Sequence, residues 1–206
     1  MFIMDDNFTF NIGRAKNICE KIIQNGYKIR WNTPNGISVR KLDRELALLM
    51  KKSGCANVCV AIESGSEWIR NECINKKISN DEITNAVNNL KQADIPVVGY
   101  VVVGMPEESI ELFNESYRFI KQLPLTSVVV SCITPFPETE LWNRLVKNKV
   151  ISNTMELSMD NLNTPTFSTE NFTKEDLIAR KQKMKDLFPG LGILERIERD
   201  NYGDSK

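Results

Sequence analysis

Four apolar segments of this chain each end on polar or small residues, and a stretch with helical periodicity follows each one. The clearest is residues 58–62, Val-Cys-Val-Ala-Ile, which stops at Glu63 and turns through Ser64 and Gly65. Residues 1–4, 97–103 and 127–133 repeat the pattern. Such runs predict buried parallel strands, whose carboxyl ends meet at the edge of a sheet where α/β proteins bind ligands. Taken alone, Glu63 favours a solvated strand end, but the repetition favours a shared ligand-binding rim.

Strand, polar turn and helix alternate from residue 2 to about residue 150, which predicts an α/β fold. We expect about five strands, at residues 2–4, 27–32, 58–62, 95–103 and 127–133, and a loop at Thr-Pro-Asn-Gly, residues 33–36. Apolar residues at helical spacing predict helices near residues 12–23, 42–50, 83–93, 110–120 and 141–146. Right-handed crossovers would curl the parallel strands into a partial barrel with the polar strand ends at one rim.

The sequence changes character near residue 152. Asn, Thr, Ser and Met dominate as far as residue 171 without a sustained period, and a charged helix is predicted at about residues 174–187. We therefore divide the chain into a partial core barrel, residues 1–151, and a C-terminal helical appendage, residues 152–206. The appendage is expected to pack on the barrel wall or to connect the barrel to another part.

Composition excludes several classes of function. The chain contains no histidine, which removes Ser-His-Asp and Cys-His nucleophile systems and every His-ligated metal site. With 27 basic and 27 acidic residues, the formal net charge is zero, so no electrostatic attraction to nucleic acid or a membrane surface is indicated. The apolar runs are too short to span a bilayer, and the N-terminus carries acids where a signal peptide carries lysines. A cytoplasmic location is expected.

The five cysteines are predicted to be structural. An odd number of cysteines in a chain without a signal sequence argues against a disulfide framework. Cys55 and Cys59 lie four residues apart, but Cys59 belongs to an apolar strand and no third cysteine follows closely.

Three further positions have features that are typical of binding sites. Asp5 and Asp6 are adjacent carboxylates that repel each other unless a cation lies between them, so they predict either a solvated turn or a receptor for an ammonium group. The turn at residues 64–67, Ser-Gly-Ser-Glu, is expected to offer free backbone N–H groups and hydroxyls, which are suited to sugar or carboxylate oxygens. Gly99, inside an apolar strand, indicates a close approach to the backbone.

Neither a Walker phosphate loop nor Gly-x-Gly-x-x-Gly occurs in the chain. Instead, a series of short motifs follows in order: Asp-Asp-Asn-Phe-Thr at residues 5–9, residues 31–37, residues 49–55, Ile-Glu-Ser-Gly-Ser at residues 62–66, residues 99–106 with Gly-Met-Pro, and Thr-Pro-Phe-Pro-Glu-Thr-Glu-Leu at residues 134–141. In this order and spacing the chain resembles the radical S-adenosylmethionine (SAM) superfamily. It is most similar to the branch whose members carry an N-terminal cobalamin-binding domain. The resemblance covers residues 2 to about 150.

The resemblance implies that the polar rim binds SAM. Asp5 and Asp6 would face the methionine ammonium of the cofactor. Glu63, with Ser64 and Gly65 beside it, would accept the ribose hydroxyls. The residue chemistry agrees, because carboxylates accept hydrogen bonds from an ammonium group and from a diol.

The adenine would lie farther along the rim. Gly99 and Gly104 resemble the glycines of the family's fifth strand and would flank the base. Backbone groups of Ser131 to Ile133 would meet its edge. Apolar walls with small residues suit a flat ring.

One departure from the family is large. The family's chemistry needs a 4Fe–4S cluster held by a Cys-x3-Cys-x2-Cys loop after the first strand, and the sequence contains no such triplet. The chain also begins at what would be the second strand, so we expect it to be the C-terminal part of a longer enzyme. The missing N-terminal half, including any cobalamin domain, or a second chain would then meet the open edge at residues 2–4. Glu108 and Glu138 are smaller departures.

We therefore predict that the chain contributes the SAM pocket of a radical SAM enzyme, in which the cluster cleaves SAM reductively, and that it is inactive alone. One alternative is a cluster-free module that binds an adenosyl ligand or a partner without catalysis. The other is an α/β domain whose rim carboxylates only solvate the turns. The small-molecule substrate is not indicated by the sequence.

Overall fold

A parallel four-stranded sheet forms the centre of the computed structural model, which describes residues 1–157 and 164–189. The strands follow the order β1 (Trp31–Ile37), β2 (Cys55–Glu63), β3 (Val97–Val103) and β4 (Ser127–Cys132), and all three pairings are parallel. Neighbours in sequence are neighbours in the sheet, as in a barrel built from successive strand-helix-strand units. The predicted α/β fold with a partial parallel barrel is confirmed.

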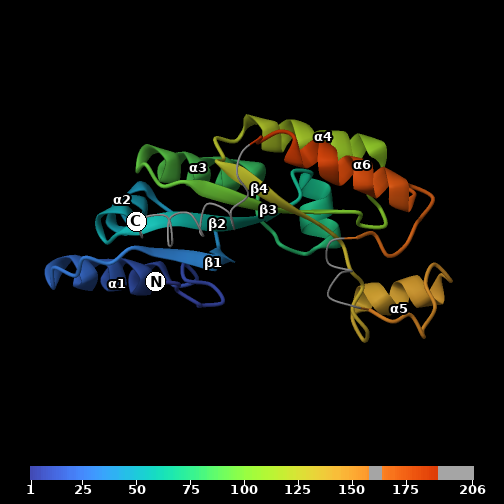
Figure 1. Ribbon diagram of the computed structural model, residues 1–206, viewed down its shortest axis with the longest axis horizontal. Helices are drawn as coiled ribbons and strands as arrows, with labels where there is room; N and C mark the ends of the chain where they lie inside the picture. The colour runs from blue at the N-terminus through green and yellow to red at the C-terminus, as the bar shows by residue number, and fades with distance from the viewer. Residues whose placement is uncertain (158–163, 190–206) are drawn as a thin grey trace, which may run out of the picture.

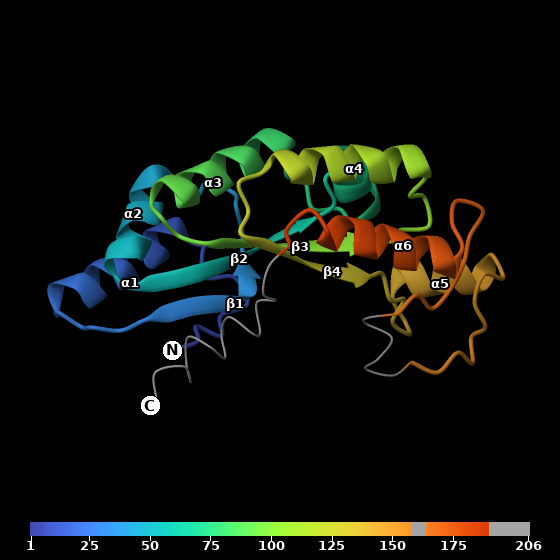
Figure 2. The same ribbon diagram turned by 45° about the horizontal axis from the view of Figure 1, so that its top comes forward.

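Helices precede, connect and follow the four strands. They are α1 (Ile12–Gln24), α2 (Arg44–Lys52), a single π-helical turn η1 (Ile69–Cys73), α3 (Asn80–Gln92), α4 (Ile110–Gln122), α5 (Glu140–Lys147) and α6 (Lys174–Lys185). Each α-helix begins at a polar side chain that accepts a hydrogen bond from a backbone N–H of the first turn. From α1 to α6, these accepting residues are Asn11, Asp43, Ser79, Ser109, Thr139 and Thr173. Helices α2, α3 and α4 lie along one face of the sheet (Figures 1 and 2).

The two faces of the sheet have different environments. Successive residues of a strand point to opposite faces, so Val60 and Ile62 lie on one face of β2, and Ala61 and Glu63 lie on the other. Val60 and Ile62 are fully buried in the hydrophobic core. Ala61 and Glu63 are only partly buried. The second face is therefore the one available to a ligand.

The first connection departs from the sequence prediction. The predicted strand at residues 27–32 is displaced, because β1 runs from Trp31 to Ile37 through the segment predicted as a loop. Thr33 pairs with Val58, and Ile37 pairs with Val60. Four residues of β1 therefore span the same distance along the sheet as two residues of β2. The segment with Pro34 and Gly36 is thus a bulge within a strand, which is a recognised position for these two residue types.

The N-terminal segment forms less sheet than predicted. Phe2 makes a single parallel bridge with Asn32, and the Ile3 N–H donates to the Asn32 carbonyl at 2.9 Å. No further ladder pairing of residues 2–4 is present among the described residues, so the sheet has four strands rather than about five.

Helix α6 packs against β4 and lies beside α4 (Figures 1 and 2). Leu177 and Met184 from α6 belong to the same hydrophobic core as the sheet. Arg180 is almost completely buried and donates to the Glu108 carbonyl at 2.8 Å and to the Asn171 carbonyl at 3.0 Å. The region from residue 164 to 189 therefore packs on the sheet at its β4 edge. The domain boundary at residue 151 stays a prediction.

The Glu108 side chain is buried where α6 meets the β3–α4 turn. Its carboxylate accepts a hydrogen bond from the Gly104 N–H at 2.9 Å and lies 3.5 Å from the Arg180 guanidinium. Burial raises the pKa of the Glu108 carboxyl to about 7, although the Gly104 N–H and Arg180 oppose the rise. The folded chain thus holds a proton here more tightly than the unfolded chain.

We predict a pH dependence of stability that originates at Glu108. Its stabilising contribution is complete below the ordinary glutamate pKa of about 4.3 and is lost as the pH rises to about 7. Relative to Glu108→Gln, the free energy of unfolding of the wild type should therefore fall over this interval, by up to about 3 kcal/mol. Urea unfolding at several pH values measures the difference. Parallel curves for the two proteins would contradict the prediction, and Glu20→Gln on the exposed side of α1 is the control.

Candidate functional site

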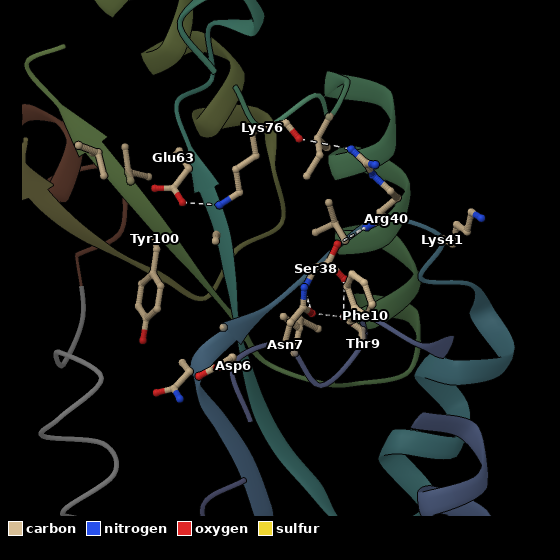
Figure 3. A pocket seen from close by; sticks show the side chains of 18 of the residues that line it. Asp6, Asn7, Thr9, Phe10, Ser38, Arg40, Lys41, Glu63, Lys76 and Tyr100 are labelled. Carbon is tan, nitrogen blue, oxygen red and sulfur yellow. Dashed lines mark hydrogen bonds and ion pairs between the residues drawn. The ribbon is translucent and has the colours of Figure 1, made fainter. Parts of the chain in front are cut away.

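A cavity of about 1050 Å³ opens on the face of the sheet that carries Ala61, Tyr100 and Ser131 (Figure 3). Its other walls come from the turn at residues 6–10, from residues 35–41, and from the loop at residues 75–78. The cavity is slightly larger than the range of roughly 300–1,000 Å³ that is typical for small-molecule sites. It therefore has room for one large ligand or two smaller ones.

Glu63 ends β2 at the cavity with a backbone φ of +63°. This left-handed conformation is unusual for a residue with a long side chain, and such strain is found at functional sites more often than elsewhere. The Glu63 carboxylate forms an ion pair with Lys76, whose side chain enters from the loop at residues 75–78 (Figure 3). Both side chains are less than a third exposed, so solvent screens this pair only partly.

Arg70 supports the backbone on both sides of this ion pair. Its guanidinium is completely buried and donates to the Ser64 carbonyl at 2.6 Å, to the Ile78 carbonyl at 2.9 Å and to the Asn80 side chain at 2.8 Å. The loop that carries Lys76 is thereby tied to the end of β2 that carries Glu63.

The two adjacent aspartates take different environments. Asp5 does not line the cavity; it pairs with Arg14 at 2.8 Å and accepts a hydrogen bond from the Asn7 N–H. Asp6 does line the cavity and is exposed, and no hydrogen bond or ion pair joins it to any other described residue. The structure therefore separates this pair, and only Asp6 offers a free carboxylate to a ligand.

Ser64 and Gly65 lie behind the cavity wall, and the prediction of free N–H groups here is wrong. The Gly65 N–H donates to Ser116 Oγ at 2.7 Å, and the Ser66 N–H donates to Ser64 Oγ at 3.2 Å. A Cβ atom on Gly65 would lie 2.5 Å from the Ser116 carbonyl oxygen. Glycine is required here because helix α4 packs directly on the turn, and the polar groups of the turn are used by that contact.

Two predicted glycines also face the protein interior. A Cβ atom on Gly99 would meet Ile62 and Leu125 side chains at 3.0 Å, so the close approach at this position comes from the core. Gly104, with φ of +94°, turns the chain after β3 against Leu177 of α6. Ser131, by contrast, lines the cavity. Of the predicted site residues, the structure thus brings Asp6, Glu63 and Ser131 to one cavity; their roles toward a cofactor stay predictions.

Sequence reasoning missed Tyr100, which lies on the cavity wall between Glu63 and Asp6 (Figure 3). Its hydroxyl donates to the Pro34 carbonyl at 2.6 Å and so connects β3 to the β1 bulge across β2. Burial, with a smaller contribution from Cys59, raises the pKa of the Tyr100 phenol, which keeps the hydroxyl protonated as a donor. A tyrosine among valines in a predicted strand was the available signal.

A second group of missed residues joins the cavity walls to each other. The Thr9 hydroxyl donates to the Ser38 carbonyl at 2.7 Å, and the Asn7 side chain accepts from the Ser38 N–H at 3.1 Å. Arg40 donates to the carbonyls of Lys76 and Lys77. Three chain segments, residues 7–10, 38–41 and 75–77, form the mouth of the cavity, and these hydrogen bonds cross-link them before any ligand binds. These contacts leave no periodic signal in the sequence.

The cysteines do not gather around the cavity. All five are free thiols, and four are buried. Within residues 1–157 and 164–189, no three Cys, Asp or Glu side chains converge in a way that could hold a metal ion. The residues described here therefore do not fit a 4Fe–4S cluster, which thiolates must hold.

Comparison with known proteins identifies the fold and the family. The family model described as the radical SAM superfamily matches residues 1–120. The chain belongs to the radical SAM superfamily. The family resemblance seen in the sequence is thereby confirmed.

Individual relatives extend the match through most of the chain. A methyltransferase of Pyrococcus horikoshii whose function is not characterised is 30% identical over 203 residues, which cover 93% of this chain and 43% of that protein. Cytidylyl-2-hydroxyethylphosphonate methyltransferase of Streptomyces wedmorensis is 28% identical over 151 residues, 70% of this chain and 28% of that protein. This radical SAM chain thus spans less than half of these relatives.

A solved structure shares the fold of this chain. The radical SAM methyltransferase TsrM from Kitasatospora setae, solved with cobalamin and a 4Fe–4S cluster bound, aligns with a TM-score of 0.61. The alignment is 20% identical and covers 71% of this chain and 30% of TsrM. At this identity the likeness establishes a common fold.

None of the helices in the described residues has the length and apolar character needed to cross a bilayer.

The packing at Gly65 predicts that Gly65→Ala lowers the free energy of unfolding by about 1–3 kcal/mol, because the added methyl group overlaps the α4 backbone. Urea denaturation measures the change. Gly13→Ala in helix α1 is the matched control: its methyl group would lie 3.4 Å from the Asn11 side chain, so stability should be kept or raised. Equal effects of the two substitutions would contradict the prediction.

The backbone at Glu63 predicts an unusual order of stability. Glu63→Gly and Glu63→Ala both remove the ion pair with Lys76, but only glycine relieves the left-handed conformation. The glycine variant should therefore be more stable than the alanine variant by about 1 kcal/mol. The same pair of substitutions at Glu20 in helix α1 should give the opposite order, because glycine is the poorer helix former. Chemical unfolding of the four variants provides the test.

Proposed function

We propose that the cavity is the SAM site of a radical SAM enzyme to which this chain contributes. The observation that carries the proposal is Glu63, whose backbone is strained and whose side chain shares one cavity with the unpaired carboxylate of Asp6. Family membership supports it, because the matched region includes both residues. The methyltransferase names of two relatives support a methyl-transfer reaction for the whole enzyme.

The chemistry of the lining residues fits the parts of SAM. The Asp6 carboxylate would accept hydrogen bonds from the methionine ammonium, and the Glu63 carboxylate would accept them from the ribose diol. Lys76, next to Glu63, supplies a cation for the methionine carboxylate. The valines on β3 and β4 that line the cavity would cover an adenine ring, with Ser131 at its edge.

In this proposal the residues of the chain bind and orient the cofactor. SAM, when bound, supplies the activated methyl or adenosyl group. Glu63 fixes the ribose because its backbone is held by β2 and by Arg70 through the Ser64 carbonyl. Tyr100 keeps its hydroxyl protonated and holds the β1 wall, so the cavity retains its shape around the ligand.

We derive no step through a 4Fe–4S cluster, because the described residues do not fit one. Reductive cleavage of SAM and any use of cobalamin therefore belong to the proposal for the whole enzyme. The scattered cysteines also favour a second candidate, in which the chain binds an adenosyl ligand without catalysis. Formation of 5′-deoxyadenosine by this chain alone with a reductant would exclude that candidate.

The proposal predicts that the purified chain binds SAM and that Asp6→Asn and Glu63→Gln each weaken binding by about tenfold or more, because each removes a charged acceptor. Isothermal titration calorimetry measures the dissociation constant. Glu20→Gln, which changes a carboxylate outside the cavity, is the control and should bind like the wild type. Wild-type affinity in both cavity variants would overturn the proposed function, and thermal unfolding checks that each variant is folded.

A further inference from the structure

The mouth of the cavity carries a charge that the protein itself does not neutralise. Arg40 lines the cavity and is exposed, and its guanidinium donates to the neutral carbonyls of Lys76 and Lys77 and not to any carboxylate in residues 1–157 or 164–189. Its NH2 group makes those contacts, which leaves N–H donors for a further acceptor. Lys41, the next residue, adds a second cation without a carboxylate partner in the described chain, although its side chain points outward (Figure 3).

The same mouth exposes an aromatic ring. Phe10 lines the cavity with 84% of its surface exposed, more than any other large hydrophobic residue of the described chain. Single exposed apolar residues are common on protein surfaces. Phe10 differs because it lines the same cavity as Arg40, where a bound molecule would cover its ring (Figure 3).

Both side chains stand on backbone that is already fixed. The Thr9 and Asn7 side chains bind Ser38, which joins the Phe10 turn to the segment that carries Arg40. Arg40 in turn joins that segment to residues 76 and 77. Lys41, Asn75 and Lys77 have left-handed backbone with φ between 53° and 61°. A mouth that is cross-linked and strained before binding is the kind of preorganised surface that ligand sites use.

We propose that Phe10 and Arg40 form a substrate subsite that binds a planar, unsaturated molecule bearing a carboxylate or phosphoryl group. The guanidinium binds the anion through its remaining N–H donors, because its planar fork matches such oxygens. The Phe10 ring covers the planar body next to the anion. The subsite rests on the proposed function, in which the inner part of the cavity holds SAM and the outer part is left for the molecule acted on.

The test uses three probes that share one ring system: 2-naphthoate, 2-naphthyl phosphate and the uncharged 2-naphthylmethanol. Calorimetry measures their affinity for the wild-type chain with SAM present. We expect one or both anions to bind at least tenfold more tightly than the alcohol, and which of them binds more tightly identifies the anion. Equal affinity for all three probes, or no binding of either anion, would overturn the subsite.

Variants assign the binding to the two residues. Arg40→Gln and Phe10→Ala should each weaken binding of the preferred anion by about tenfold, and Arg40→Lys should restore part of the loss because it keeps the charge. Arg118→Gln and Phe136→Ala change an exposed arginine and an exposed phenylalanine outside the cavity, and should bind like the wild type. If Phe10→Ala binds normally, the planar part of the proposal is wrong. If Arg40→Gln binds normally, the anion part is wrong.

SAM affinity measured in the same variants separates this proposal from the proposed function. It should stay within about twofold of the wild type, because neither residue is assigned to the cofactor. If SAM fails to bind while the anions still depend on Arg40 and Phe10 in its absence, the proposed function falls and the subsite stands. If SAM binds and the probes show no dependence on either residue, the subsite falls and the proposed function stands.

Discussion

The contact between the Ser64-Gly65 turn and helix α4 fixes the part of the molecule on which the candidate site depends. The Ser116 hydroxyl accepts the Gly65 N–H at 2.7 Å, and there is no space for a side chain at Gly65. Arg70 binds the Ser64 carbonyl from the other side. A turn held at both sides cannot relax, so Glu63 keeps a left-handed backbone that an unconstrained glutamate would leave.

Charge is distributed unevenly around the cavity although the chain as a whole is neutral. Glu63 and Lys76 neutralise each other, whereas Asp6 and Arg40 have no charged partner among the described residues and lie on different walls. Opposite unpaired charges at separate positions suit a ligand, or a pair of ligands, with a cationic and an anionic end. Net charge alone conceals such an arrangement, because it averages over the whole surface.

Sequence patterns succeeded where one element determines its own conformation. The apolar β-branched run of β3 and the polar ends of the strands both came from local periodicity. The patterns failed where a distant residue decides. Thr33 to Gly36 reads as a loop, yet β2 and the Tyr100 hydroxyl hold it as a bulged strand. Gly65 reads as a ligand position, yet α4 occupies its open side.

The sequence by itself determined the parallel α/β class, the family, and the strand end that carries Glu63, because periodicity, residue order and motif spacing are properties of the chain alone. Only the tertiary structure decided which of the candidate residues share one cavity. It divided Asp5 from Asp6 by pairing Asp5 with Arg14, and it assembled the mouth from Phe10, Arg40 and Lys76. These residues are distant in sequence, so their proximity arises from packing between elements, which no local pattern encodes.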